Sequence, residues 1–163
     1  FAEVFSRVSQ PLSFSLELLT LLNIFLMTGA ELQQKLNEHC QQIHDQLSGF
    51  LFYGILSCAD GTTLAKASAN DEVSKTIEQG SAFNLTIVNQ VKQVVASNKG
   101  LGELQLDFIL IETNKITFMM MVSSQGKFFS ITALDREKAN LGIARALIYK
   151  SKTEYGDILD NFF

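Results

Sequence analysis

Residue types that build cross-linked scaffolds or irregular chains are scarce in these 163 residues. There are only two cysteines, Cys40 on an expected helix and Cys58 on an expected strand, and their number and spacing predict no disulfide framework. A single proline, no tryptophan and a hydrophobic share of 47% exclude a disordered or Pro-rich chain. The composition predicts one ordered domain with a well-filled core, in a reducing cytoplasm.

Positive charge is also in short supply. Lys and Arg number 13 against 17 Asp and Glu, and no basic stripe occurs along the chain. Because nucleic-acid binding depends on clustered Lys and Arg that neutralise phosphates, the sequence predicts no nucleic-acid partner.

The few candidates for metal binding or catalysis do not assemble into a site. His39 and His44 are five positions apart on an expected helix and point in different directions, although Cys40 and His44 could share a face. A zinc site needs about four such ligands, and a nucleophile-elbow sequence is missing around Cys58 and Asp60. We expect no metal, no cofactor and no enzymatic activity, with both histidines on a solvated or half-buried helix surface and Cys58 buried in a strand.

A dense apolar run fills residues 12–28, interrupted by Glu17 and Asn23. It barely reaches the lower limit for a membrane span, so a transmembrane helix is disfavoured. Its narrow polar stripe predicts a helix that packs on its own domain or on a twin subunit. Weaker alternatives are membrane-surface attachment, which the lack of Lys and Arg on the polar face disfavours, a secretory signal, and a natural start at Met27. We assign residues 1–28 to an N-terminal apolar helical extension and 29–163 to the main domain.

Hydrophobic periodicity predicts the elements of the main domain. Apolar residues at helical spacing predict helices over 30–47, 71–97 and 136–150, and short apolar runs bounded by turn residues predict strands over 50–58, 62–67, 103–112, 116–123 and 127–133. The Asp60-Gly61 pair joins the first two strands as a tight hairpin. In the long second helix, Gly80-Ser81-Ala82 permits either a close approach of another element or a local bend.

Several strands are continuous apolar runs, which requires helices over both faces of the sheet. The run Met119-Met120-Met121 fits a flexible binding groove, but its place in a central strand favours core filling. The sequence therefore predicts an α/β (α+β) fold: a five-stranded antiparallel sheet with helices on both faces, in the order helix-strand-strand-helix-strand-strand-strand-helix, plus the extra N-terminal helix.

This order of elements resembles that of the roadblock family of dynein light-chain and GTPase-regulating proteins, over about residues 30–150. The resemblance is carried by the Asp60-Gly61 hairpin, by the strand pair Phe108-Ile109-Leu110-Ile111 and Ile116-Thr117-Phe118, and by the closing Ala139-Asn140-Leu141-Gly142. It implies a homodimer or heterodimer in which the strand at 103–112 pairs with its twin and the long helices at 71–97 pack together. An apolar edge strand independently favours such pairing, because it is an aggregation hazard when uncovered.

Family members serve as platforms for small Ras-like GTPases, as light chains or as membrane-linked scaffolds. The resemblance thus implies a non-enzymatic dimeric scaffold or regulator of a small Ras-like GTPase, with no arginine here assignable as a catalytic finger. The alternative is a profilin-like ligand-sensing module that binds a small molecule between sheet and helix. The candidate dimer or partner interface comprises Gln79, Phe83, Asn84, Ile87, Gln90, Val91, Val94, Leu104, Leu106, Phe108 and Leu110. The alternative is that these residues belong to the internal core of the chain.

Overall fold

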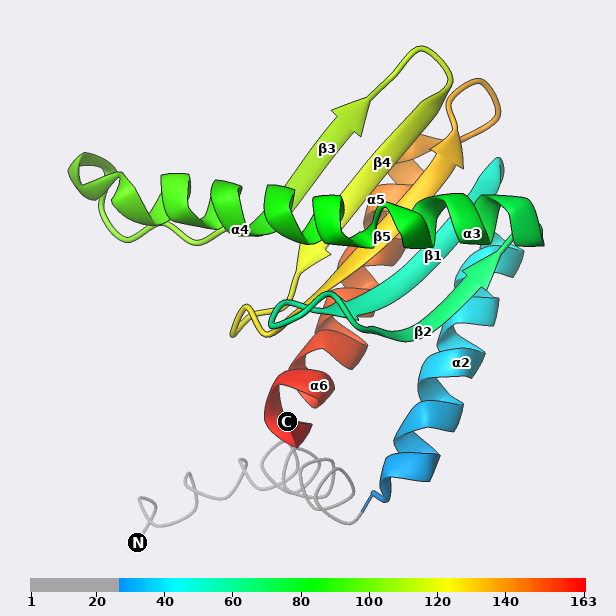
Figure 1. The fold of residues 1–163 in the computed structure, drawn as a ribbon, viewed down its shortest axis with the longest axis horizontal. Helices are drawn as coiled ribbons and strands as arrows, with labels where there is room; N and C mark the ends of the chain where they lie inside the picture. Colours follow the sequence, from blue (N-terminus) through cyan, green and yellow to red (C-terminus); the bar gives the residue numbers. More distant parts are fainter. Residues whose placement is uncertain (1–26) are drawn as a thin grey trace, which may run out of the picture.

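Five antiparallel strands in the spatial order β2-β1-β5-β4-β3 form the central layer (Figure 1). The computed structural model describes residues 27–163, so the predicted N-terminal helix lies outside the described residues except for its last two positions. The strands are β1 (Phe50–Ser57), β2 (Thr63–Ser68), β3 (Phe108–Glu112), β4 (Ile116–Val122) and β5 (Phe128–Asp135). The predicted sheet is confirmed, and β3 lies at one of its edges.

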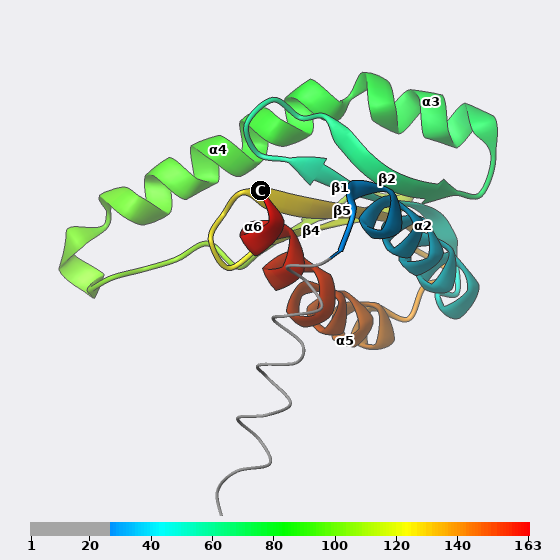
Figure 2. The same ribbon diagram turned by 90° about the horizontal axis from the view of Figure 1, so that it is seen from below.

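Helices cover both faces of this sheet. Figure 2 shows α3 and α4 on one face and α2, α5 and α6 on the other. The helical segments are α2 (Gly29–Gln46), α3 (Asp71–Gln79), α4 (Ser81–Ser97), the 3₁₀ turn η1 (Lys99–Leu101), α5 (Leu141–Ser151), the π-helical turn η2 (Lys152–Gly156) and α6 (Asp157–Phe162). The predicted two-sided cover is therefore confirmed.

Two apolar clusters explain why the strands are apolar throughout. Met119 and Met121 point toward α2 and α5, whereas Met120, between them, packs on the opposite face with Val88 of α4. All three methionines are buried. Alternate residues of one strand thus fill two different cores, which confirms that the methionine run is core and not a groove.

A capping box fixes the start of α2. Thr28 Oγ1 accepts from the Glu31 N–H at 3.3 Å, and Glu31 Oε2 accepts from the Thr28 N–H at 2.8 Å. This reciprocal pair satisfies two amide hydrogens that a helix start otherwise leaves without a partner.

Replacing the capping residue, Thr28→Ala, is expected to lower the free energy of unfolding by about 1 kcal/mol, because alanine has no side-chain oxygen to accept from the Glu31 N–H, while the backbone N–H of residue 28 can still donate to Glu31. Urea unfolding followed by circular dichroism measures it. The matched control is Thr86→Ala, whose hydroxyl bonds back to the Ala82 carbonyl inside α4 and caps nothing; it is expected to leave stability unchanged or slightly higher. Equal losses in the two variants would contradict the capping role.

The prediction of a single long helix over 71–97 is wrong in one respect, since the helix breaks at Gly80 into α3 and α4. Asn70 caps α3 by accepting from the Val73 N–H at 2.9 Å. A side chain at Gly80 would meet only carbonyls of its own helix, such as that of Ile77. Of the two explanations for Gly80-Ser81-Ala82, the structure supports the local bend.

Two further boundaries differ from prediction. The strand expected at 103–112 begins at Phe108, because β4 ends at Val122 and offers no partner to the residues before Asp107. The helix expected at 136–150 begins at Leu141, because Asp135 accepts from backbone amides of the segment after it and forms a turn there. Beyond residue 150 the helical chain continues to Phe162 as η2 and α6.

Candidate functional site

The outer edge of β3 carries backbone groups that the sheet leaves unpaired. The Val122 N–H donates to the Asp107 carbonyl at 3.1 Å, and the Thr113 N–H donates to the Ile116 carbonyl at 2.9 Å. Because hydrogen-bonding direction alternates along an antiparallel strand, Phe108, Leu110 and Glu112 direct their N–H and C=O groups away from β4. Within residues 27–163, β3 pairs with β4 alone, so this edge is free.

Helix α4 lies on the same side of the molecule as the free edge of β3. Figure 1 shows its C-terminal half running past β3, and in Figure 2 this half projects beyond the sheet. Val88 is the one residue of α4 that is buried. Phe83 and Val94 are 75% and 62% exposed, and Leu110 of β3 is 47% exposed. We call the free edge of β3 together with the outer side of α4 the edge-helix surface.

The structure leaves every predicted interface residue at least partly accessible, so none is an internal core residue of this chain. Exposed are Gln79, Phe83, Gln90, Val94, Leu104 and Leu110; half-buried are Asn84, Ile87, Val91, Leu106 and Phe108. They do not form one patch, however. Ile87 and Leu106 pack on the α4 side of the sheet, and Phe108 packs on the α5 side.

Beside the edge lies a group of α5 side chains that the sequence analysis did not select. The guanidinium of Arg145 lies 5.1 Å from the ring centre of Phe108 and 5.5 Å from that of Tyr149. Tyr149 also donates to Asp107 at 2.9 Å, and Lys152 forms an ion pair with the same carboxylate. That lysine holds the pKa of Asp107 below its usual range. The spacing of Arg145, Tyr149 and Lys152 along one helical face was the available signal.

A buried polar cluster corrects the prediction for His39. Instead of lying on a solvated surface, its Nε2 is 2.5 Å from Ser151 Oγ, which is 2.8 Å from the hydroxyl of Tyr53. Burial lowers the pKa of His39 to about 4 and raises that of Tyr53. Both side chains are therefore neutral at pH 7. The cluster ties α2 and α5 to the sheet and exposes no nucleophile.

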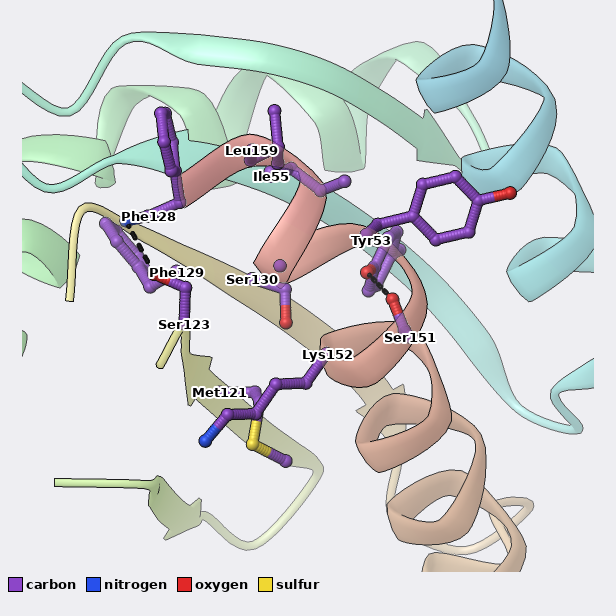
Figure 3. A pocket seen from close by; sticks show the side chains of 12 residues that line it. Tyr53, Ile55, Met121, Ser123, Phe128, Phe129, Ser130, Ser151, Lys152 and Leu159 are labelled. Atoms are coloured by element: carbon purple, nitrogen blue, oxygen red, sulfur yellow. Dashed lines mark hydrogen bonds between the residues drawn. The ribbon is translucent and has the colours of Figure 1, made fainter. Parts of the chain in front are cut away.

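The space beside this cluster is small. Figure 3 shows the cavity between the sheet and the C-terminal helical segments, with Tyr53 and Ser151 joined by a hydrogen bond at its wall. Its volume of about 30 Å³ holds roughly one water molecule. Drug-sized ligands occupy pockets of about 300–1,000 Å³, so this cavity does not fit the ligand that a profilin-like module would bind between sheet and helix.

A wider open recess of about 550 Å³ lies at the end of the sheet, between the β1–β2 and β4–β5 turns. Cys58 lines it together with Leu64, Phe128 and Phe163. Cys58 follows the end of β1 and is half-buried, which corrects its prediction as a buried strand residue. Burial raises the pKa of this thiol, so it is a poor nucleophile at pH 7.

The described residues show neither a metal-binding cluster nor a membrane-spanning helix. Residues 27–163 contain no cluster of three or more His, Cys, Asp or Glu side chains arranged to hold a metal ion. None of their helices combines the length and the apolar character that crossing a membrane requires.

Comparison with known proteins gives matches at the level of structure. No protein-family model matches the sequence, and no curated protein matches it. MglB from Myxococcus xanthus is 17% identical with a TM-score of 0.65, over 85% of this chain and 96% of that one. The gliding protein MglB from Thermus thermophilus is 12% identical with a TM-score of 0.66, over 83% of this chain and 95% of that one.

A Roadblock/LC7 domain from Streptomyces avermitilis is 12% identical with a TM-score of 0.56, over 72% of this chain and 95% of that one. At such identities the likeness concerns the fold. Together with the observed order of helices and strands, it confirms the resemblance seen in the sequence: this chain has the roadblock fold.

Proposed function

We propose that this chain forms a dimer through the edge-helix surface and acts, in the cytoplasm, as a non-enzymatic scaffold or regulator of a small Ras-like GTPase. The observation that carries the proposal is an uncovered strand edge, beside an exposed apolar helix, on a roadblock fold. Both cysteines are free thiols, which suits a reducing compartment.

The unpaired backbone groups at the free edge of β3 favour dimerisation. Two β3 strands that pair across a two-fold axis satisfy each other's outward N–H and C=O groups and join two sheets into one. The same axis brings the projecting half of α4 beside its copy. Val94, which is largely exposed in one chain, then has an apolar partner, whereas Phe83, in the first turn of α4, stays exposed.

Regulation of a GTPase requires no reactive group on this chain. In phosphoryl transfer by such enzymes, the nucleotide site supplies the magnesium ion and most of the charge stabilisation, and a bound platform acts by positioning switch loops. A broad, largely apolar dimer surface built on two α4 helices suits that role.

The dimer is tested by light scattering of the purified chain at micromolar concentration. A soluble monomer at tens of micromolar would contradict the proposal. The GTPase role is tested by titrating small Ras-like GTPases of the native host, loaded with GDP or with a GTP analogue, onto the immobilised dimer.

We expect GTPase binding to depend on the bound nucleotide. Its affinity is expected to fall at least about tenfold in Phe83→Asp, because a charge replaces an exposed aromatic anchor. Glu72→Lys, an exposed charge change at the start of α3, is the control and is expected to bind normally. Stabilisation by nucleotides or metabolites alone, with no GTPase bound, would favour the ligand-sensing alternative instead.

A further inference from the structure

Two opposite charges without ion-pair partners lie on the same side of the free edge. Phe108 packs toward α5, so the alternation of side chains puts Leu110 and Glu112 on the α5 side as well. Arg145 of α5 lies over Phe108 on that side. Within the described part of the chain, neither Glu112 nor Arg145 forms an ion pair with an oppositely charged group within 4 Å, and both are exposed.

We infer that, in the dimer proposed above, Arg145 of each protomer pairs with the partner's Glu112, and that this contact fixes the register of β3–β3 pairing with Leu110 at the two-fold axis. The inference rests on the proposed dimer and adds to it the residues that determine register and self-recognition.

The backbone favours this register. A two-fold axis perpendicular to the sheet keeps α5 of both protomers on one side and pairs side chains of the same face. With Leu110 on the axis, all three residues with outward N–H and C=O groups find partners: Phe108 with the partner's Glu112, Leu110 with the partner's Leu110, and Glu112 with the partner's Phe108. An axis at Ile109 or Ile111 leaves only two such pairs within the strands.

The charges favour the same register. Only with Leu110 on the axis does the partner's Glu112 lie directly opposite Phe108, where the Arg145 guanidinium is held. An axis at Ile111 moves the partner's Glu112 opposite Leu110, and an axis at Glu112 puts two carboxylates against each other, which is destabilising.

The neighbouring groups on α5 prepare Arg145 for this contact. Cation–π contacts with Phe108 and Tyr149 hold the guanidinium without using its hydrogen-bond donors. The nearby Asp107 is already held by Lys152 and Tyr149. The positive charge of Arg145 thus remains available to a carboxylate from outside the chain.

A charge swap tests the inference. In sedimentation experiments, Arg145→Glu and Glu112→Arg are each expected to raise the Kd of the dimer by about tenfold or more, because each creates two like-charge contacts per dimer. The double variant carries the pair in reverse order, and its Kd is expected to return to within about threefold of that of the unsubstituted chain. Lys35→Glu, a charge reversal on an exposed position of α2, is expected to change nothing.

The outcomes separate the two proposals. A monomeric unsubstituted chain overturns the dimer and the register together. A dimeric chain whose double variant is as weak as the single variants overturns the register and leaves the dimer standing. Loss of the cation–π contacts alone cannot explain recovery in the double variant, because that variant also lacks Arg145. Thermal unfolding of each variant confirms that the compared chains are folded.

Discussion

Replacing Leu110 with proline is expected to convert the proposed dimer into a folded monomer. Proline has no N–H, and at this position the missing N–H points out of the sheet, where β4 does not need it. The proline ring also stands where the partner strand must approach, and the change acts in both protomers. We expect the Kd of the dimer to rise at least about a hundredfold, with the fold retained.

Analytical ultracentrifugation measures this effect, and circular dichroism confirms the fold. The matched control is Ser68→Pro on β2, the opposite edge strand. The neighbouring Ala69 N–H donates to the Leu51 carbonyl of β1, so the N–H of Ser68 also points outward. This control is expected to remain dimeric. A Leu110→Pro variant that still dimerises as tightly as the unsubstituted chain would show that the dimer forms elsewhere.

Acidification below pH 6.5 is expected to cost the fold about 3 kcal/mol through His39 alone. Burial holds the pKa of His39 at about 4 in the folded chain, against about 6.5 for an exposed histidine. Between these values the unfolded chain binds a proton that the folded chain does not, so stability falls as pH falls. The contribution is fully present above pH 6.5 and is lost by about pH 4.

Urea unfolding at several pH values from 7 to 4 measures this dependence. The variant His39→Gln, which cannot titrate, is expected to be less stable at pH 7 but to lose less stability on acidification. His44→Gln, on the exposed side of the same helix, is the matched control and is expected to follow the unsubstituted chain. Carboxylates with lowered pKa values, such as Asp107, affect all three chains alike. Identical pH slopes for the unsubstituted chain and His39→Gln would contradict the burial of a neutral histidine.

Periodicity made much of the fold predictable, because the pattern of apolar residues records which sides of a segment are buried. The continuous runs at Phe108–Ile111 and Met119–Met121 already required helices on both faces, and Asp60-Gly61 marked the first hairpin. The candidate edge came instead from the family resemblance. Short connections make the last three strands neighbours, but only the pairing of β5 with β1 leaves β3 outermost.

Other features depend on contacts between residues far apart in the chain. His39 looked like a surface residue in its own helix and is buried because Tyr155 stacks on its ring and Ser151, 112 positions later, lies against it. Likewise, the start of β3 depends on where β4 ends, and Arg145 became a candidate only when α5 was placed over Phe108. The sequence by itself determined the elements, the turns and the two-sided burial, since these follow from local periodicity and backbone preference. Only the tertiary structure decided which polar groups meet, because burial and pairing are properties of distant segments brought together.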